Sequence, residues 1–497
     1  MRNVVTLLAA AALLAACAST TTVTNPVSGR AERTVMDEAT EVAEGKKAHE
    51  QVLAEFGGAL ANPRLAAYVD ELGQRLAKQS HRANLQWTFT VLDSPDVNAF
   101  ALPGGYVYVT RGILAYMDSE ADLAGVLGHE IGHVTARHGA QRATKQARAG
   151  AGVMAATVLG VLLEAGGVRG AAQAANQVSS SVAAGAVASY SREHELQADQ
   201  LGAEYLSRVG YSPKHMVDVI GLLKDQERFA ADTARADGRP PPQAANWLST
   251  HPSNDERLQA ITRVAEGYKG SAGEDGQARF LRAIDGITYG DSREQGVVRG
   301  QNFFHEPLGL ALTAPAGWRI DNDADQLLIV NPAADAALVM KLVPPEAGKT
   351  HEEILRNALK ASQGRVDRTP VGGFEATWFS GQRAGPNNQT QPLDVTLVTG
   401  PGGRIYALLQ AGRDAAALQR SRAALREATL SFRALTAADR AAARPWLIRT
   451  QAMPAGGFAE LARRSPLGAQ AERQLRLING VYSGGNIAPG RVVKVVE

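Results

Sequence analysis

The sequence predicts a multidomain protein in which a mainly α-helical domain with a small β-sheet precedes an α+β domain and a small C-terminal module. Its 497 residues are enough for about three domains, at roughly 150 residues each. Apolar residues recur at helical spacing through most of residues 36–267, whereas short strand-like runs alternate with helical patterns over residues 301–435. A Gly-rich stretch after the first domain predicts a linker over residues 268–300, and residues 440–497 make up the last module.

The composition excludes several classes of protein. Lys and Arg number 52 against 50 Asp and Glu, so the net charge of +2 does not indicate a nucleic-acid partner. A mean hydropathy of -0.17 is typical of a soluble globular chain and not of a polytopic membrane protein. The single cysteine allows neither an internal disulfide nor a structural zinc site built from cysteines.

The first 17 residues have the pattern of a secretory signal peptide. Arg2 supplies a positive charge, and the apolar run from Val4 to Ala16 is too short to span a bilayer. The four residues ending at Cys17 resemble the bacterial lipobox, which implies a lipidated Cys17; the alternative is an ordinary signal peptide. By the same analogy, Ala18 implies a periplasmic protein anchored to the inner leaflet of the outer membrane, with residues 18–35 as a tether.

Strands and a long helix are expected in the first domain. Apolar residues alternate from Leu85 to Val91, and a second run, Val97 to Val109, is broken by Pro103-Gly104-Gly105, which predicts strands linked by a tight turn. Ser119 and Asp122 resemble a capping box before apolar residues at helical spacing. A long amphipathic helix is therefore expected to begin near Ser119.

Residues 150–188 differ from their surroundings because they are rich in Ala, Gly, Ser and Val. The apolar run Val153 to Leu163 is too short to cross a bilayer, and Glu164 follows it directly. We expect a buried or cleft-covering helical hairpin here, with a membrane-contacting segment as the alternative.

The motif His129-Glu130-Ile131-Gly132-His133 lies within the predicted long helix. At 3.6 residues per turn, His129 and His133 stack on one face, and Glu130 lies about 100° round the axis, near a shared ion without having to bind it. Zinc suits two imidazoles and an open position for water, whose pKa it lowers towards about 7. Glu130 would then accept the proton of that water as it attacks a carbonyl and deliver it to the leaving amine.

A third ligand is needed. On a continuous helix His138 lies about 140° from His133, so it is expected to have a structural role. Glu195 is the better candidate because Asp199, four residues on, shares its helix face and could orient a ligating histidine. From spacing alone, Glu193 and His194 remain competitors.

Three segments together resemble a known family: HEIGH, the segment Ser191 to Asp199 about sixty residues later, and the upstream segment Asn98 to Gly105. They look like the zinc metallopeptidases of the CAAX prenyl protease and HtpX type, family forty-eight of the metallo series, with a zincin-like (gluzincin) fold. The most similar branch is the periplasmic lipoprotein branch that includes the β-barrel assembly-enhancing protease. The resemblance covers about residues 36–267.

This resemblance implies a function for each matching residue. His129, His133 and Glu195 would bind one zinc ion per chain, Glu130 would be the general base and acid, and Asp199 would support a ligand. His251 matches a family position that closes over the zinc or faces the substrate, so it is a candidate switch or auxiliary ligand. The segment expected to bind substrate backbone by strand addition consists of Asn98, Ala99, Phe100 and Ala101.

The C-terminal part differs from the β-barrel assembly-enhancing protease. No helical repeat of about 34 residues is present, and residues 301–435 show no constellation of reactive side chains. Residues 440–497 resemble a degenerate LysM module, which implies contact with peptidoglycan.

The hypothesis from sequence is a lipid-anchored zinc endopeptidase (EC 3.4.24.-) that cleaves misfolded or stalled envelope proteins. Its partners would be these unfolded substrates, the membrane through the anchor, and peptidoglycan. One alternative is a non-catalytic chaperone or binding lipoprotein that contacts peptidoglycan, and a second is a peptidoglycan amidase.

Overall fold

The computed structural model describes residues 21–149, 190–236, 247, 251, 255–268, 273–323, 325–384 and 390–497. The predicted signal peptide with Cys17, and the Ala- and Gly-rich segment at 150–188, lie outside the described residues. Within the described part of the chain, no helix combines the length and the apolar character that crossing a membrane requires.

The expected tether is in part an ordered ribbon. Strands β1 (Thr21–Thr24) and β2 (Ala31–Thr34) pair antiparallel around a turn in which the Asn25 side chain accepts hydrogen bonds from two following backbone N–H groups. The ribbon is joined to the first domain because the backbone N–H of Val35 donates to Thr144 Oγ1 at 3.0 Å. Its β-branched residues and this side-chain turn favour a hairpin, which the expectation of a tether had not included.

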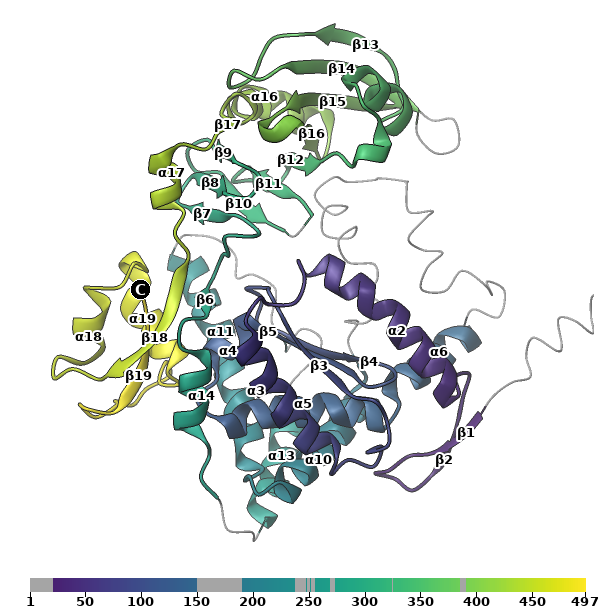
Figure 1. Cartoon of the computed structure of the whole chain (residues 1–497), viewed down its shortest axis with the longest axis vertical. Helices are drawn as coiled ribbons and strands as arrows, with labels where there is room; N and C mark the ends of the chain where they lie inside the picture. The colour runs from purple at the N-terminus through teal and green to yellow at the C-terminus, as the bar shows by residue number, and fades with distance from the viewer. Residues whose placement is uncertain are drawn as a thin grey trace, which may run out of the picture.

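The first domain combines helices with a small sheet of strand order β3-β5-β4, as expected from the sequence (Figure 1). β3 and β5 run parallel, and β4 pairs antiparallel with β5 through the Pro103-Gly104-Gly105 turn, where both glycines have a positive φ. The predicted strands and tight turn are therefore confirmed. The elements are α2 (Glu38–Glu55), α3 (Pro63–Ala77), β3 (Thr88–Leu92), β4 (Ala99–Leu102), β5 (Tyr106–Thr110), α4 (Arg111–Tyr116), α5 (Glu120–Thr135), α6 (His138–Ala149), α10 (Arg192–Arg208), α11 (Lys214–Ala236) and α13 (Asp255–Gly267).

Helix α5 begins where the sequence predicts. Ser119 is its N-cap, and the capping box is complete: the Ser119 hydroxyl accepts from the backbone of Asp122, whose side chain accepts from the backbone of Ser119. Every residue of α5 is buried. The helix therefore lies in the core between α3, α10 and α11, and its direction is fixed from its first turn.

The predicted linker contains a buried helix. α14 (Gln277–Ile284) packs against α3 and α5, and Phe280 and Ile284 are fully buried in the core of the first domain. The sequence pattern missed it because the helix spans only 8 residues and lies between glycines. The strand β6 (Thr288–Tyr289) follows.

The C-terminal module packs onto the same core. Its order is β18 (Trp446–Ala452), α18 (Gly457–Ala462), α19 (Ala471–Ile478) and β19 (Val492–Val496), with the short 3-10 helix η5 (Gly468–Gln470) before α19. β18 pairs antiparallel with β19 on one side and with β6 on the other. Its resemblance to LysM stays a prediction.

The α+β domain is inserted between β6 and β18 and lies at the top of Figure 1. One sheet has the order β10-β11-β12-β16-β15-β14-β13, a second has the order β17-β9-β8-β7, and α16 packs on β9, β12 and β16. The elements are β7 (Val297–Arg299), β8 (Asn302–His305), β9 (Leu310–Thr313), β10 (Arg319–Asn322), β11 (Leu327–Val330), β12 (Ala336–Leu342), η1 (Pro345–Ala347), α15 (His351–Glu353), η2 (Ile354–Ala358), β13 (Ala361–Asp367), β14 (Ala376–Ala384), β15 (Thr390–Thr399), η4 (Pro401–Gly403), β16 (Ile405–Gly412), α16 (Ala415–Leu430), β17 (Arg433–Ala434) and α17 (Ala437–Ala442).

A buried lysine connects the C-terminal module to the residues before α5. Lys494 is fully buried, its Nζ donates to the carbonyl of Met117 at 2.6 Å, and it pairs with Asp118 at 2.9 Å. Because Met117 and Asp118 directly precede the N-cap of α5, the module is connected to the start of that helix.

Replacing Lys494 with Met is expected to lower the free energy of unfolding by about 1–3 kcal/mol, because a buried carbonyl and a carboxylate lose their partner. Urea unfolding of the full chain measures this. The control is Arg491→Met, which removes an exposed charge just before the same strand. Equal unfolding midpoints for the two variants would show that the Lys494 contacts do not stabilise the module's attachment.

Candidate metal centre

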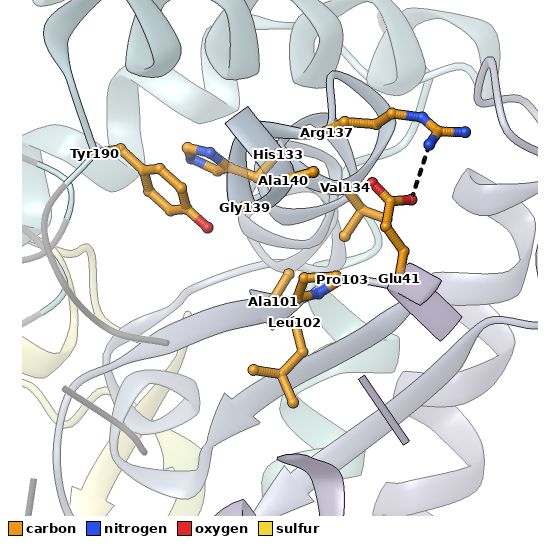
Figure 2. A pocket seen from close by; sticks show the side chains of 10 residues that line it. All are labelled: Glu41, Ala101, Leu102, Pro103, His133, Val134, Arg137, Gly139, Ala140 and Tyr190. Carbon is orange, nitrogen blue, oxygen red and sulfur yellow. Dashed lines mark ion pairs between the residues drawn. The ribbon is translucent and has the colours of Figure 1, made fainter. Parts of the chain in front are cut away.

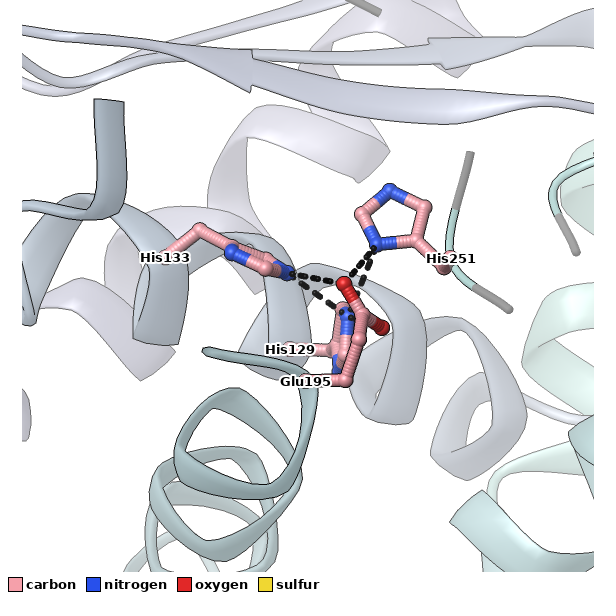
Figure 3. Close-up of side chains that lie close together, drawn as sticks. All are labelled: His129, His133, Glu195 and His251. Atoms are coloured by element: carbon pink, nitrogen blue, oxygen red, sulfur yellow. Dashed lines mark hydrogen bonds and ion pairs between the residues drawn. The ribbon is translucent and has the colours of Figure 1, made fainter. Parts of the chain in front are cut away.

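Two histidines of α5 converge on one point. His129 and His133 are one helical turn apart and buried, and their Nε2 atoms are 3.0 Å apart (Figure 3). This is the arrangement that the motif predicts for two imidazoles that share an ion.

Glu195 on α10 completes the cluster. Its carboxylate oxygens each lie 3.5 Å from an Nε2 atom, one from His129 and the other from His133. The two alternative third ligands lie elsewhere. Glu193 is exposed, and His194 Nε2 lies 3.0 Å from Gln141 Oε1. The structure thus places Glu195, and neither of the alternatives, beside the two histidines.

Glycines allow the two helices to come this close. A Cβ on Gly132 would lie 2.9 Å from the carbonyl oxygen of Ala198, and a Cβ on Gly202 would lie 3.0 Å from the backbone nitrogen of His129. Side chains at these positions would push α10 away from α5. The glycine within HEIGH therefore has a packing function, because it lets Glu195 reach the histidines.

Two further side chains orient the imidazoles. His129 Nδ1 donates to Asp199 Oδ1 at 2.8 Å, which leaves Nε2 to face the cluster. His133 Nδ1 lies 2.9 Å from His138 Nδ1, and His138 Nε2 lies 3.1 Å from Gln197 Oε1. Burial lowers the pKa of His138 to about 3, so its neutral ring can accept from His133 and donate to Gln197.

The position of His138 differs from the one expected on a continuous helix. α5 ends at Thr135, Arg137 has a φ of 55°, and α6 begins at His138. This left-handed residue turns the chain, so that His138 returns to the His133 ring instead of pointing about 140° away. A non-glycine residue at positive φ gave no signal in the sequence.

Arg257 of α13 is a site residue that the sequence reasoning missed. Its guanidinium donates to both oxygens of Asp199 at 2.6 and 2.8 Å, lies 2.9 Å from Glu195 Oε2, and donates to the carbonyl of His251 at 2.8 Å. Only 2% of the residue is exposed. It lies in the same segment as His251, but its role depends on the packing of α13 against α10, which periodicity does not predict.

The charge states of these groups follow from their neighbours. Burial opposes ionisation of Glu195, but the nearby His251 and the hydrogen bond from His129 hold its pKa well below the usual range. Burial likewise opposes ionisation of Asp199, and the Arg257 guanidinium keeps its pKa below the ordinary value. Both carboxylates are therefore anionic at neutral pH.

The pKa values of His129 and His133 shift in opposite directions. Burial lowers the pKa of His133 well below its usual range, so this ring is neutral. Burial also disfavours a charge on His129, but hydrogen bonds to Asp199 and Glu195 outweigh it and raise the pKa of His129 to about 9. A metal ion at Nε2 would take the place of this extra proton.

Glu130 lies beside the cluster and not in it. The Trp247 indole N–H donates to Glu130 Oε1 at 2.9 Å, and His251 Nε2 lies 3.4 Å from the same oxygen. The other oxygen, Oε2, is buried and has no hydrogen-bond partner among the described residues. A buried carboxylate oxygen without a donor is suited to accept a proton from a reactant in the cleft.

His251 lies against the same cluster. Its Nδ1 is 3.1 Å from Glu195 Oε1 and 3.2 Å from His129 Nε2. The structure thus brings it next to the predicted ligands, and its function as a switch or an auxiliary ligand stays a prediction.

The residues fit a zinc ion. His129, His133, Glu195 and His251 offer ligand atoms that all lie within 4.8 Å of one another. Donors bound at about 2.0 Å around one tetrahedral ion are about 3.3 Å apart, close to the 3.0 and 3.5 Å found between the two histidines and Glu195. Imidazole nitrogen and carboxylate oxygen are both common zinc ligands.

The expected substrate strand packs against α5, the helix that carries the two histidines. Asn98 precedes β4, which contains Ala99, Phe100 and Ala101. Phe100 stacks on Tyr108, away from α5 and on the side of α2, and so anchors the strand. Among the described residues no strand pairs with the outer edge of β4, although the backbone N–H of Trp247 donates to the Val97 carbonyl just before it.

Comparison with known proteins agrees with this site. Residues 63–265 match the model of peptidase family M48. A putative β-barrel assembly-enhancing protease of Vibrio cholerae is 32% identical over 207 residues, 42% of this chain and 40% of the relative. The β-barrel assembly-enhancing protease of Escherichia coli K12 is 30% identical over 40% of this chain and 38% of its own length. The mitochondrial metalloendopeptidase OMA1 of Schizosaccharomyces pombe is 29% identical over 48% of this chain and 64% of its own.

The match thus spans less than two thirds of the length of each of these relatives, and it contains both helices of the metal cluster. M48 is a family of zinc-dependent metallopeptidases, which agrees with a cluster of His, His, Glu and His that could hold a metal. Residues 63–265 of this chain therefore match peptidase family M48 and contain the cluster of side chains that could hold the metal of a metalloendopeptidase.

Proposed function

We propose that the protein is a zinc endopeptidase that cleaves extended segments of misfolded or stalled envelope proteins. The observation that carries the proposal is the buried Glu130, which lies beside a cluster of imidazole and carboxylate groups able to hold zinc and has one oxygen without a hydrogen-bond partner among the described residues. In this function His129, His133 and Glu195 hold the metal.

The chain's own residues supply the proton transfers. Zinc, when bound, acts as a Lewis acid that polarises the scissile carbonyl and makes water a better nucleophile. Glu130 accepts a proton from the attacking water and delivers it to the leaving amine. Trp247 holds one oxygen of Glu130, so the other remains available for this transfer. Asp199 and Arg257 keep His129 and Glu195 in place.

The outer edge of β4 supports extended peptide segments as the class of substrate. An extended peptide that adds to this edge forms main-chain hydrogen bonds that do not depend on its sequence, as recognition of unfolded chains requires. The names of the bacterial relatives, which refer to β-barrel assembly, support substrates in the bacterial envelope. Lipidation of Cys17 and anchoring in the outer membrane stay predictions from the sequence.

Removing the metal is the direct test of this function. The purified protein is expected to contain one zinc per chain and to cleave reduced, alkylated casein. Incubation with a chelator should abolish cleavage, and added zinc should restore it. A natively folded, disulfide-linked protein of similar size is the matched substrate and should remain uncut. The proposal fails if zinc is absent from the purified protein or if the chelated protein still cleaves casein.

A further inference from the structure

A pocket opens next to the metal cluster, between His133 and the end of β4. Its empty space is about 240 Å³ when the part open to solvent is counted, and the enclosed part has room for only about one water molecule (Figure 2). Its apolar lining comes from the edge strand and its turn, from the helix break after His133, and from the residues before α10: Ala101, Leu102, Pro103, Val134, Ala140 and Tyr190.

Close packing fixes the walls. The Tyr190 ring stacks on the His133 ring with centroids 3.9 Å apart, which joins one wall to a predicted metal ligand. A Cβ on Gly139 would lie 3.1 Å from Pro103 Cγ, so α6 and the β4–β5 turn are already in contact. Ala140 is buried and has a minimal side chain, so the space in front of it depends on its size. The pocket can therefore accept only a short side chain.

Charges at the far end select against ionised side chains. The buried Glu41 carboxylate of α2 pairs with Arg82 at 2.8 Å. It also pairs with Arg137 at 3.3 Å (Figure 2). An ionised side chain in the pocket would meet both members of the Glu41–Arg137 ion pair, so attraction to one is offset by repulsion from the other. It would also lose water on entering, so a neutral apolar group is favoured.

The location of the pocket indicates on which side of the scissile bond its occupant would lie. His133 forms one wall, whereas Glu130 and His251 lie outside the lining. The pocket thus extends from the metal cluster toward the C-terminal end of β4. A peptide added antiparallel to β4 would run from the Leu102 end toward the Ala99 end, so the residue over the pocket precedes the scissile bond.

We propose that this pocket selects a small apolar residue, such as Ala or Val, on the amino-terminal side of the scissile bond. The inference rests on the proposed peptidase function and adds to it a rule of substrate choice. Ala140 and Val134 are then specificity-determining residues.

Mapping cut sites tests the pocket. Zinc-loaded full-length enzyme is incubated with a mixture of reduced, alkylated proteins, and mass spectrometry identifies the cleaved bonds. Wild type is expected to prefer Ala and Val at one position before the bond. Ala140→Leu should shift that preference to Gly and Ala, with cleavage after Val reduced about tenfold or more, whereas Val134→Ala should admit Leu and Met. The control is Ala67→Leu at an exposed position of α3.

The outcomes separate the two proposals. If wild type cleaves nothing in the presence of zinc, the peptidase function itself fails. If wild type cleaves but shows no preference before the bond, or if both pocket variants retain the wild-type pattern, the pocket inference is overturned and the peptidase function stands. A preference confined to residues after the bond would also overturn it. Because one variant fills the pocket and the other enlarges it, misfolding of either one leaves the other as a test.

Discussion

Replacing Glu130 with Gln is expected to reduce casein cleavage by about 10²- to 10⁴-fold while zinc content remains at the wild-type level. Gln has the same shape, and its amide oxygen can still accept from the Trp247 indole, so the fold and the metal cluster are preserved. It cannot accept a proton from the attacking water. The measurement pairs the rate of cleavage with metal analysis of the same sample.

The matched control is Glu193→Gln, which makes the same chemical change at an exposed position near the metal-binding end of α10. It should retain full activity. This pair of variants also decides between the enzyme and the non-catalytic alternative. If Glu130→Gln cleaved casein at the wild-type rate, Glu130 would not be the base; if it restored growth of a deletion strain as well as wild type does, a chaperone function would replace the peptidase in the cell.

Replacing Arg257 with Met is expected to lower the free energy of unfolding of the metal-free protein by about 3–5 kcal/mol. Asp199 and Glu195 are both nearly fully buried, and the Arg257 guanidinium contacts both of them, as His129 also does. Without it, two carboxylates remain close together in a medium that solvates charge poorly. The hydrogen bond to the carbonyl of His251 is lost as well.

Urea unfolding with and without zinc measures this effect. Bound zinc carries positive charge to the same carboxylates, so the loss should be smaller in the zinc-loaded protein than in the metal-free one. Arg263→Met, which removes an exposed arginine from the same helix, is the control and should change stability by no more than about 0.5 kcal/mol. Equal losses for the two variants would mean that Arg257 does not neutralise the buried pair.

The two histidines of the candidate metal centre and Glu130 were the most predictable part of this molecule. His129, Glu130 and His133 lie within one helix, so helical geometry alone places them relative to one another. The capping box at Ser119 is equally local, and the structure confirms it. Spacing favoured Glu195 as the third ligand but could not exclude Glu193 and His194, because the ligand depends on how α10 packs against α5.

The parts that could not be predicted depend on contacts between distant segments. Arg257 and Trp247 reach the site from a region whose sequence pattern gives only a helix and breakers. His138 required knowledge of a left-handed Arg137. The helix α14 is short and lies between glycines, so its burial against α3 and α5 overrides the local pattern that suggested a linker.

The pairing of β6 with β18 determines how the inserted α+β domain is held. Thr288 lies opposite Leu447 and Tyr289 opposite Trp446, so the chain leaves the peptidase body and returns to it at neighbouring points. A unit attached by two short crossings has far less freedom to diffuse than one on a single long linker. Any protein captured by that domain would therefore be held at a high effective concentration beside the peptidase body, and cleavage would compete with its release.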